Sequence, residues 1–108
     1  MPKGYEVERV ALRDEEKLRS SLPKGARLIV LDERGADLTT EKFAALLRSP
    51  SAFVIGGADG LSSETKSKAH TLLKLSALTL PHALAQVILL EQIYRGATLL
   101  TGHPYHRK

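Results

Sequence analysis

The sequence contains no cysteine and no long apolar run among its 108 residues. The absence of cysteine excludes disulfide bonds and thiolate metal sites. No stretch reaches the roughly 18 consecutive apolar residues that indicate a membrane-spanning helix. The first ten residues, MPKGYEVERV, lack the apolar core of a secretory signal peptide. Internal repeats and low-complexity segments are absent as well. The length and these absences predict a single domain, residues 1–108, located in the cytoplasm.

The charge of the chain is mildly positive, with a net charge of +4 and a sequence pI of about 9.6. Such a value is compatible with a nucleic-acid partner, and equally with a soluble protein that has a slight excess of lysine and arginine. The distribution of charge is more informative. The last acidic residue is Glu91, and Arg95, Arg107 and Lys108 follow it. We therefore expect a local positive field at the C-terminal end.

Hydrophobic patterning predicts strands that alternate with helices. The apolar run RLIVLD is nearly continuous, which is typical of a strand covered on both faces. The expected strands are 27–32, 52–56 and 72–76, with an edge strand at 5–10. The expected helices are 14–22, 41–48, 62–70 and 81–100. This alternation favours the α/β class, with a parallel sheet flanked by helices.

Local signals mark the helix starts and one turn. We expect the turn at residues 33–35, between a strand and the second helix. Hydroxyl side chains suited to capping a helix N-terminus precede three of the helices. These are Thr39 or Thr40, Ser62 or Ser63, and Thr79. Pro81 is expected within the first turn of the last helix, where its missing N–H costs little.

The last helix is apolar on every side near its start. Between Ala83 and Leu90 only Gln86 is polar. A helix with this pattern is buried on more than one side. We expect its outer side to meet a second subunit by two-fold symmetry. The alternative is a helix wedged inside the monomer.

Two clusters suggest other chemistry but support it weakly. The glycine-rich segment 56–60, GGADG, follows a strand and precedes a helix, as nucleotide-binding loops do. It lacks the P-loop pattern, so an ordinary turn explains it equally well.

His103 and His106 are three residues apart, but no acidic residue lies near them in the sequence, so we expect no metal site. No G-x-S-x-G elbow is present, and a serine hydrolase is therefore unsupported.

Three stretches in order resemble one family. They are FVIGGADGLSSETK (53–66), LSALTLPHALAQVILLEQIYR (75–95) and TGHPYHRK (101–108). Together they closely resemble the ribosomal large subunit methyltransferase H family, whose members are SPOUT-class enzymes that methylate N3 of a pseudouridine in 23S rRNA. The resemblance covers residues 26–108 well and the preceding segment more loosely.

The resemblance implies a SPOUT fold with a deep trefoil knot near the C-terminus, which holds S-adenosylmethionine. It also implies a homodimer through the C-terminal helix that acts on the assembled ribosome. The implied cofactor-binding residues come from three loops: Leu31, Gly57, Ser76, Ala77, Leu78, Thr79, Leu80 and Pro81. Among them, Leu31, Leu78 and Leu80 are suited to enclosing the flat, apolar adenine, while backbone groups read its polar edge.

The C-terminal tail carries the catalytic residues that the resemblance implies: His103, Tyr105, His106 and Arg107. Arg107 is suited to stabilising negative charge on a carbonyl oxygen. His103, Tyr105 or His106 is suited to accepting or relaying the proton of N3, and the choice among them stays open. His82 is interpreted as a residue that starts the helix or supports the site. Glu91, Tyr94 and Arg95 are interpreted as an ordered network at the interface.

The sequence departs from the family pattern at two places. The family's chains begin with a further strand and helix that this sequence lacks, which predicts an exposed sheet edge. The family's asparagine before HPYHR is Gly102 here. The alternative to an active enzyme is therefore a knotted, dimeric cofactor- and RNA-binding module that has lost catalysis.

Overall fold

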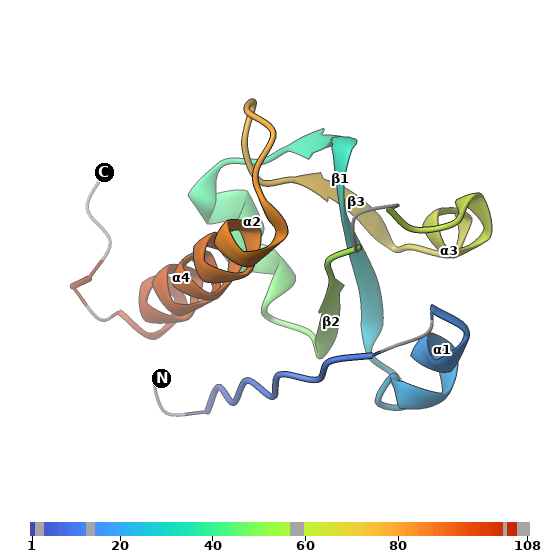
Figure 1. Ribbon diagram of the computed structural model, residues 1–108. Coiled ribbons are helices and arrows are strands. Elements are labelled where there is room, and N and C mark those ends of the chain that lie inside the picture. Colours follow the sequence, from blue (N-terminus) through green and yellow to red (C-terminus); the bar gives the residue numbers. More distant parts are fainter. Residues whose placement is uncertain (2–3, 13–14, 57–59, 103, 106–108) are drawn as a thin grey trace.

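The computed structural model describes residues 1, 4–12, 15–56, 60–102 and 104–105. Its described part is an α/β unit built on a three-stranded parallel sheet (Figure 1). The strands are β1 (Arg27–Asp37), β2 (Ser51–Val54) and β3 (Thr71–Lys74), in the spatial order β2-β1-β3. The predicted fold class is confirmed, and all three predicted central strands are present. The trefoil knot implied by the resemblance stays a prediction.

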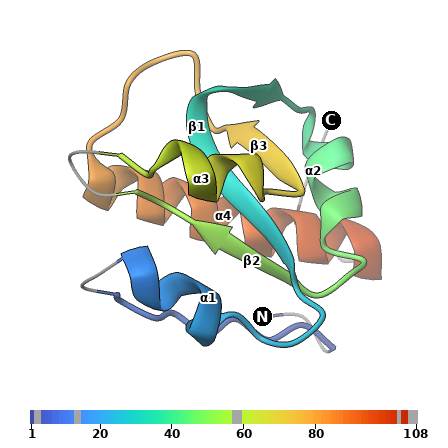
Figure 2. The same cartoon turned by 90° about the vertical axis from the view of Figure 1, so that its right-hand side faces the viewer.

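Helices cover both faces of this sheet. They are η1 (Glu15–Lys17), α1 (Leu18–Ser21), α2 (Thr40–Leu46), α3 (Ser63–Ser67) and α4 (His82–Thr101). The pair α2 and α4 lies on one face, and α3 lies on the other with η1 and α1 nearby (Figures 1 and 2). The two helices α2 and α4 approach closely at Gly96. A Cβ atom there would lie 2.9 Å from Leu47 Cδ1 and 3.2 Å from Ala44 Cα.

The core lies between the sheet and the α2–α4 pair. Its buried members are Ile29, Phe43, Leu73, Leu89 and Ile93. The rings of Phe43 and Phe53 stack with their centroids 5.5 Å apart, which joins α2 to β2. The side of α4 that faces this core therefore packs on both α2 and the sheet.

Strand β1 is irregular in its second half. Both Leu31 and Ala36 are paired with Leu73 of β3, so residues 32–35 leave the ladder and the strand then resumes. An Asp32 Oδ1 atom accepts a hydrogen bond of 2.9 Å from the Arg34 N–H, which bends the segment. A Cβ atom on Gly35 would lie 2.6 Å from the backbone of β3, so only glycine fits there. The turn expected at 33–35 is thus an excursion inside a longer strand.

Two local predictions are wrong. Residues 5–10 are not a strand, and they have no ladder partner among the described residues. The N-cap of α4 is Pro81 rather than Thr79, and the Thr79 hydroxyl donates instead to Glu33 Oε1 at 3.2 Å. Thr39 caps α2 and Ser62 caps α3, each by accepting from the backbone N–H three residues further on. These two caps match one of the two residues predicted at each position.

In the part of the chain that the structure describes, no helix has the combined length and apolar character needed to cross a membrane.

Candidate active site

The predicted cofactor loops meet at the carboxyl edge of the sheet. Because all three strands are parallel, their carboxyl ends lie at one edge, where ligands commonly bind in open α/β sheets. Leu31 stands where β1 leaves its ladder, half-buried opposite Leu73. Gly56 follows β2, and Ser76 follows β3. The topology therefore brings segments from three distant parts of the sequence to one place.

The segment 76–81 forms the upper part of this edge (Figure 1). The Ser76 Oγ atom accepts a hydrogen bond of 3.0 Å from the Leu78 N–H, which closes a small turn. That turn leaves the Leu78 side chain 76% exposed, while Leu80 and Ser76 are half-buried. Ala77, Thr79 and Pro81 are exposed. The edge thus presents apolar side chains and short polar groups, a composition that suits a nucleoside with a flat apolar base.

His82, the first residue of α4, joins two of these loops. Its Nδ1 atom lies 3.0 Å from the carbonyl oxygen of Gly56, and its Nε2 atom lies 2.9 Å from Nε2 of Gln86. The sequence interpretation of His82 as a helix-start or supporting residue fits this position. The bond to Gly56 spans 26 residues, and no local pattern could have indicated it.

Glu15 is a further residue near the loops, and sequence reasoning missed it. Its carboxylate accepts a bond of 3.0 Å from the Ser62 N–H, together with short bonds from the Ser62 and Thr65 hydroxyls. These bonds hold the pKa of Glu15 below its ordinary value. Glu15 therefore ties η1 to the start of α3, immediately after the glycine-rich segment.

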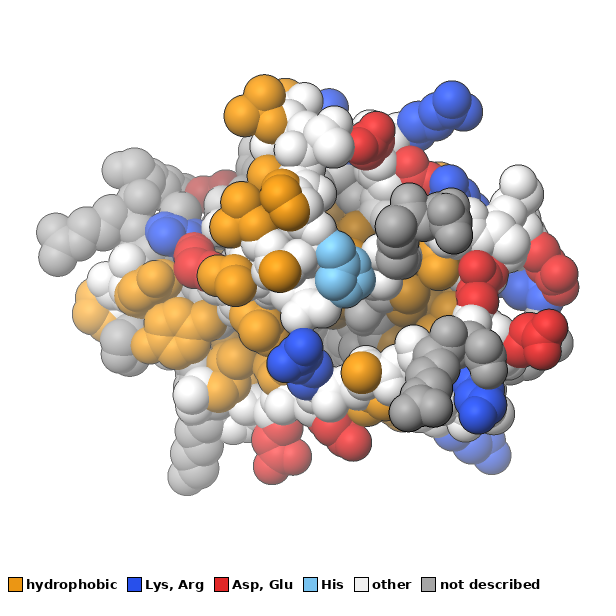
Figure 3. Space-filling view, viewed as in Figure 1, with side chains coloured by type: hydrophobic (Ala, Val, Ile, Leu, Met, Phe, Trp, Pro, Cys, Tyr) orange, Lys and Arg blue, Asp and Glu red, His pale blue; other side chains and the backbone are white. Residues whose placement is uncertain are grey.

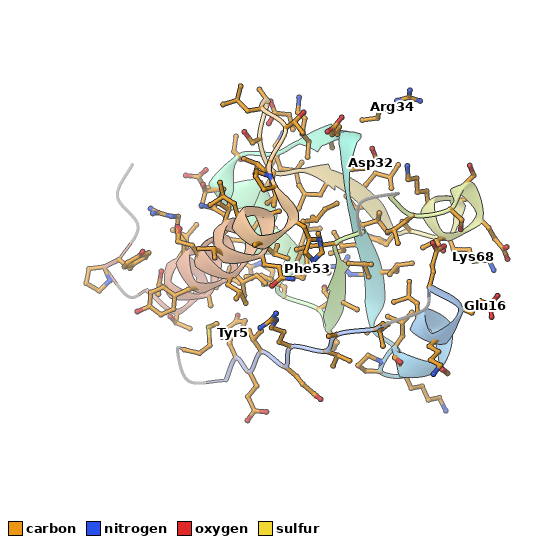
Figure 4. All side chains as sticks on the ribbon, in the orientation of Figure 1. Tyr5, Glu16, Asp32, Arg34, Phe53 and Lys68 are labelled. Atoms are coloured by element: carbon orange, nitrogen blue, oxygen red, sulfur yellow. The ribbon has the colours of Figure 1, made fainter. Side chains whose placement is uncertain are left out.

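A hollow of about 390 Å³ lies between α3 and the irregular segment 32–35 of β1. Asp32 and Arg34 line it, and Figure 4 shows both side chains at the upper part of β1. Lys66 of α3 makes an ion pair of 3.0 Å with Asp32. The Arg34 N–H and then Lys66 lower the pKa of the Asp32 carboxyl. Because Asp32 neutralises Lys66, this hollow is less basic than its lysine and arginine suggest.

Tyr105 lies at the opposite end of α4 from the cofactor loops. Its ring packs edge-on against Tyr94, with centroids 4.8 Å apart, and Arg95 Cζ lies 5.1 Å from its centroid. Arg95 also pairs with Glu91 at 2.7 Å, and this bond raises the pKa of Arg95. Arg95 thus contacts both Glu91 and Tyr105, and Tyr94 contacts Tyr105, whereas the predicted place of these side chains at a subunit interface stays a prediction.

The outward side of α4 is apolar and uncovered in the single chain. Leu84, Val87 and Leu90 are 46%, 62% and 41% exposed. Figure 3 shows apolar side chains gathered over α4 and the loop that precedes it. These side chains are not covered by the described residues, so this side of α4 is not wedged inside the described part of the chain.

Four predicted site residues lie outside the described residues: Gly57, His103, His106 and Arg107. Within the described ranges no group of three or more histidine or acidic side chains is placed to hold a metal ion. The described site residues are thus Leu31, Ser76–Pro81 and Tyr105, the last of which stands apart.

Known proteins resemble this chain over most of its length. A family described as "Predicted SPOUT methyltransferase" matches residues 2–106. A ribosomal RNA large subunit methyltransferase H of Burkholderia lata is 48% identical over 110 aligned positions, covering 96% of this chain and 70% of that protein. The protein of the same name in Polynucleobacter necessarius is 51% identical over 98 positions, covering 85% of this chain and 73% of that protein.

A parallel sheet with helices on both faces defines a domain of the α/β class, and the carboxyl edge where its three loops lie is the usual place for a ligand in such sheets. The chain belongs to the SPOUT methyltransferase family, because the family match spans nearly its whole length. The predicted resemblance is thereby confirmed.

Proposed function

We propose that this chain is an S-adenosylmethionine-dependent methyltransferase that modifies N3 of a pseudouridine in 23S rRNA of the assembled ribosome. We further propose that it works in the cytoplasm as a homodimer through α4. The convergence of the three loops at the carboxyl edge carries the proposal. The names of the relatives support the rRNA substrate, and the basic composition suits an RNA partner.

The described residues fit S-adenosylmethionine. Leu78 is exposed, and Leu31 and Leu80 are half-buried at the same edge, so apolar surface is available for the adenine. In the segment 76–81 the Leu78 N–H is bonded to Ser76 and the Pro81 carbonyl to Ala85. The other backbone groups lie outside helix and strand and are suited to the polar edge of the adenine. The full proposed cofactor set is Leu31, Gly57, Ser76, Ala77, Leu78, Thr79, Leu80 and Pro81. When bound, the cofactor supplies an electrophilic methyl group.

The chain's own residues have two chemical tasks. N3 of pseudouridine is an imide nitrogen, and it becomes a good nucleophile when it loses its proton. Arg107 is proposed to stabilise the negative charge that develops on the adjacent carbonyl oxygen. One of His103, Tyr105 and His106 is proposed to accept or relay the proton, and Tyr105 is also suited to stacking on a base.

The length of α4 supports a composite site. Its 20 residues place the C-terminal end of α4 about 30 Å from the segment 76–81 that precedes it. Antiparallel packing of two α4 helices brings the tail of the partner subunit near those loops. The exposed apolar side of α4 is the surface that such packing would cover. We therefore propose that each site combines the loops of one subunit with the tail of its partner.

Calorimetric titration tests the cofactor assignment. We expect S-adenosylmethionine to bind the wild-type chain, and Leu80→Ala to weaken that binding by about tenfold through lost apolar contact. Leu12→Ala, an exposed leucine of the N-terminal segment, is the matched control and should bind as the wild type does. A plain nucleotide-binding loop predicts ATP binding that Leu80→Ala does not change. That outcome would contradict the proposal.

A further inference from the structure

We propose that His82 is a positioning residue that fixes the carboxyl end of β2 against the start of α4, in the neutral form with its proton on Nδ1. The inference rests on the proposed function, because it assigns the fixed segment to the cofactor site. The Gly56 carbonyl oxygen can only accept a hydrogen bond, so the Nδ1 atom 3.0 Å away must donate. The Nε2 atom then holds a lone pair, which accepts from the Gln86 amide at 2.9 Å.

The contact acts at the base of the glycine-rich segment. A Cβ atom on Gly56 would lie 3.0 Å from Leu61 Cγ and 3.1 Å from the Gly60 carbonyl carbon. The two sides of the segment therefore meet at Gly56, and a restraint on its carbonyl restrains both. Gly57, a proposed cofactor residue, follows immediately in sequence. Because His82 also follows Pro81, one side chain connects two of the three proposed cofactor loops.

The same contacts argue against His82 as the base. Both ring nitrogens are occupied, one as donor and one as acceptor. A nitrogen that accepts from Gln86 has no free lone pair for the proton of a substrate. His82 therefore acts on the reaction through the backbone that it holds, and Gln86 acts by fixing the tautomer of His82.

Three substitutions separate positioning from general structural damage. His82→Ala removes both bonds. His82→Asn keeps a donor, because the asparagine amide nitrogen takes nearly the place of Nδ1, and so preserves the bond to Gly56. His70→Ala is the matched control, because His70 is an exposed histidine whose contact is with Arg27, at the start of β1 and the opposite edge of the sheet.

The decisive experiment combines nitrogen NMR of the histidine rings at pH 8 with calorimetric titration of S-adenosylmethionine. We expect His82 to show a protonated Nδ1 and an unprotonated Nε2. We expect His82→Ala to weaken cofactor binding by about three- to tenfold, the effect of one hydrogen bond at an exposed site. His82→Asn should restore affinity to within about twofold, and His70→Ala should leave it unchanged.

Two results would overturn the inference: a proton on Nε2 of His82, or wild-type affinity in His82→Ala. Failure of the proposed function looks different, because the wild-type chain would then bind no S-adenosylmethionine at all. In that case two NMR observations decide whether His82 positions Gly56: the tautomer of the His82 ring, and the chemical shift of the Gly56 carbonyl carbon. A protonated Nδ1 with a Gly56 shift that moves in His82→Ala supports positioning, and an unmoved shift rejects it.

Discussion

Individual residues hold the proposed site together over long sequence distances. Glu15 bonds Ser62 across 47 residues, and His82 bonds Gly56 across 26. No local sequence pattern marks either pair, because backbone N–H groups, carbonyls and hydroxyls occur throughout the chain. Leu31 and Leu80 were identified from the family resemblance, and the structure places both at the same sheet edge. The resemblance therefore supplied the residues proposed to line the site, which stay a prediction, and the contacts that position them follow only from the fold.

Glu15 gives the chain a testable dependence on pH. Its hydrogen bonds lower its pKa from the ordinary 4.5. The resulting stabilisation is complete above that ordinary value and is lost as pH falls through the lowered one. We expect Glu15→Gln to reduce the free energy of unfolding at pH 7, and the difference from wild type to shrink below pH 4.5. Urea unfolding at a series of pH values measures this.

The neighbouring Glu16 provides the control for that series. Glu16→Gln changes an exposed carboxylate one residue further along η1 (Figure 4). It should leave the free energy of unfolding nearly unchanged at every pH. The prediction fails if the difference in free energy of unfolding between the wild type and Glu15→Gln stays constant down to the most acidic conditions. Ionisation of Glu15 would then not be the source of that difference.

Among the secondary-structure elements, β1 and α4 show where sequence patterns succeed and where they stop. The apolar run of β1 predicted its buried half, but not its return after residues 32–35. That return depends on the close approach of Gly35 to β3, which is a tertiary contact. Residues 5–10 alternate like a strand, yet no neighbouring strand pairs with them among the described residues. An alternating pattern indicates that the side chains suit a sheet, but it does not indicate whether a neighbouring strand is present to pair with them.

The apolar pattern of α4 predicted burial on more than one side, and the single chain buries one of them. One face buries Ala85, Leu89 and Ile93, and the opposite face exposes Leu84 and Val87. An exposed apolar strip of this kind indicates a protein contact. Its place on a 20-residue helix suits two-fold packing against a second copy, which remains our proposal.

Charge substitutions on the exposed face of α4 test the dimer. We expect Leu84→Glu and Val87→Glu each to convert a dimer into a monomer, because a carboxylate would be desolvated at the interface. Sedimentation velocity measures the assembly state. Val7→Glu, at an exposed valine outside α4, is the matched control and should stay dimeric. Dimers in both α4 variants would place the interface elsewhere. Ile88 is a poorer test position, because it is half-buried and lines a cavity beside β3.

At the scale of the whole molecule, the proposed cofactor segment 76–81 and Tyr105 lie at opposite ends of α4. Tyr105 is held there by Tyr94 and Arg95 of its own chain. A single chain therefore presents half of the proposed site at each end, and two antiparallel chains complete two sites. The tail motif predicted a functional surface, and the structure adds that Tyr105 lies far from its own chain's loops.

The most direct test of the account is transfer of a tritiated methyl group from S-adenosylmethionine to ribosomes that lack this modification. We predict label in 23S rRNA, at N3 of one pseudouridine. Tyr105→Ala should bind the cofactor as the wild type does and lose transfer by about 100-fold or more, since it removes a group that acts only on the substrate. A folded, cofactor-binding wild-type chain that leaves 23S rRNA unlabelled would contradict the account.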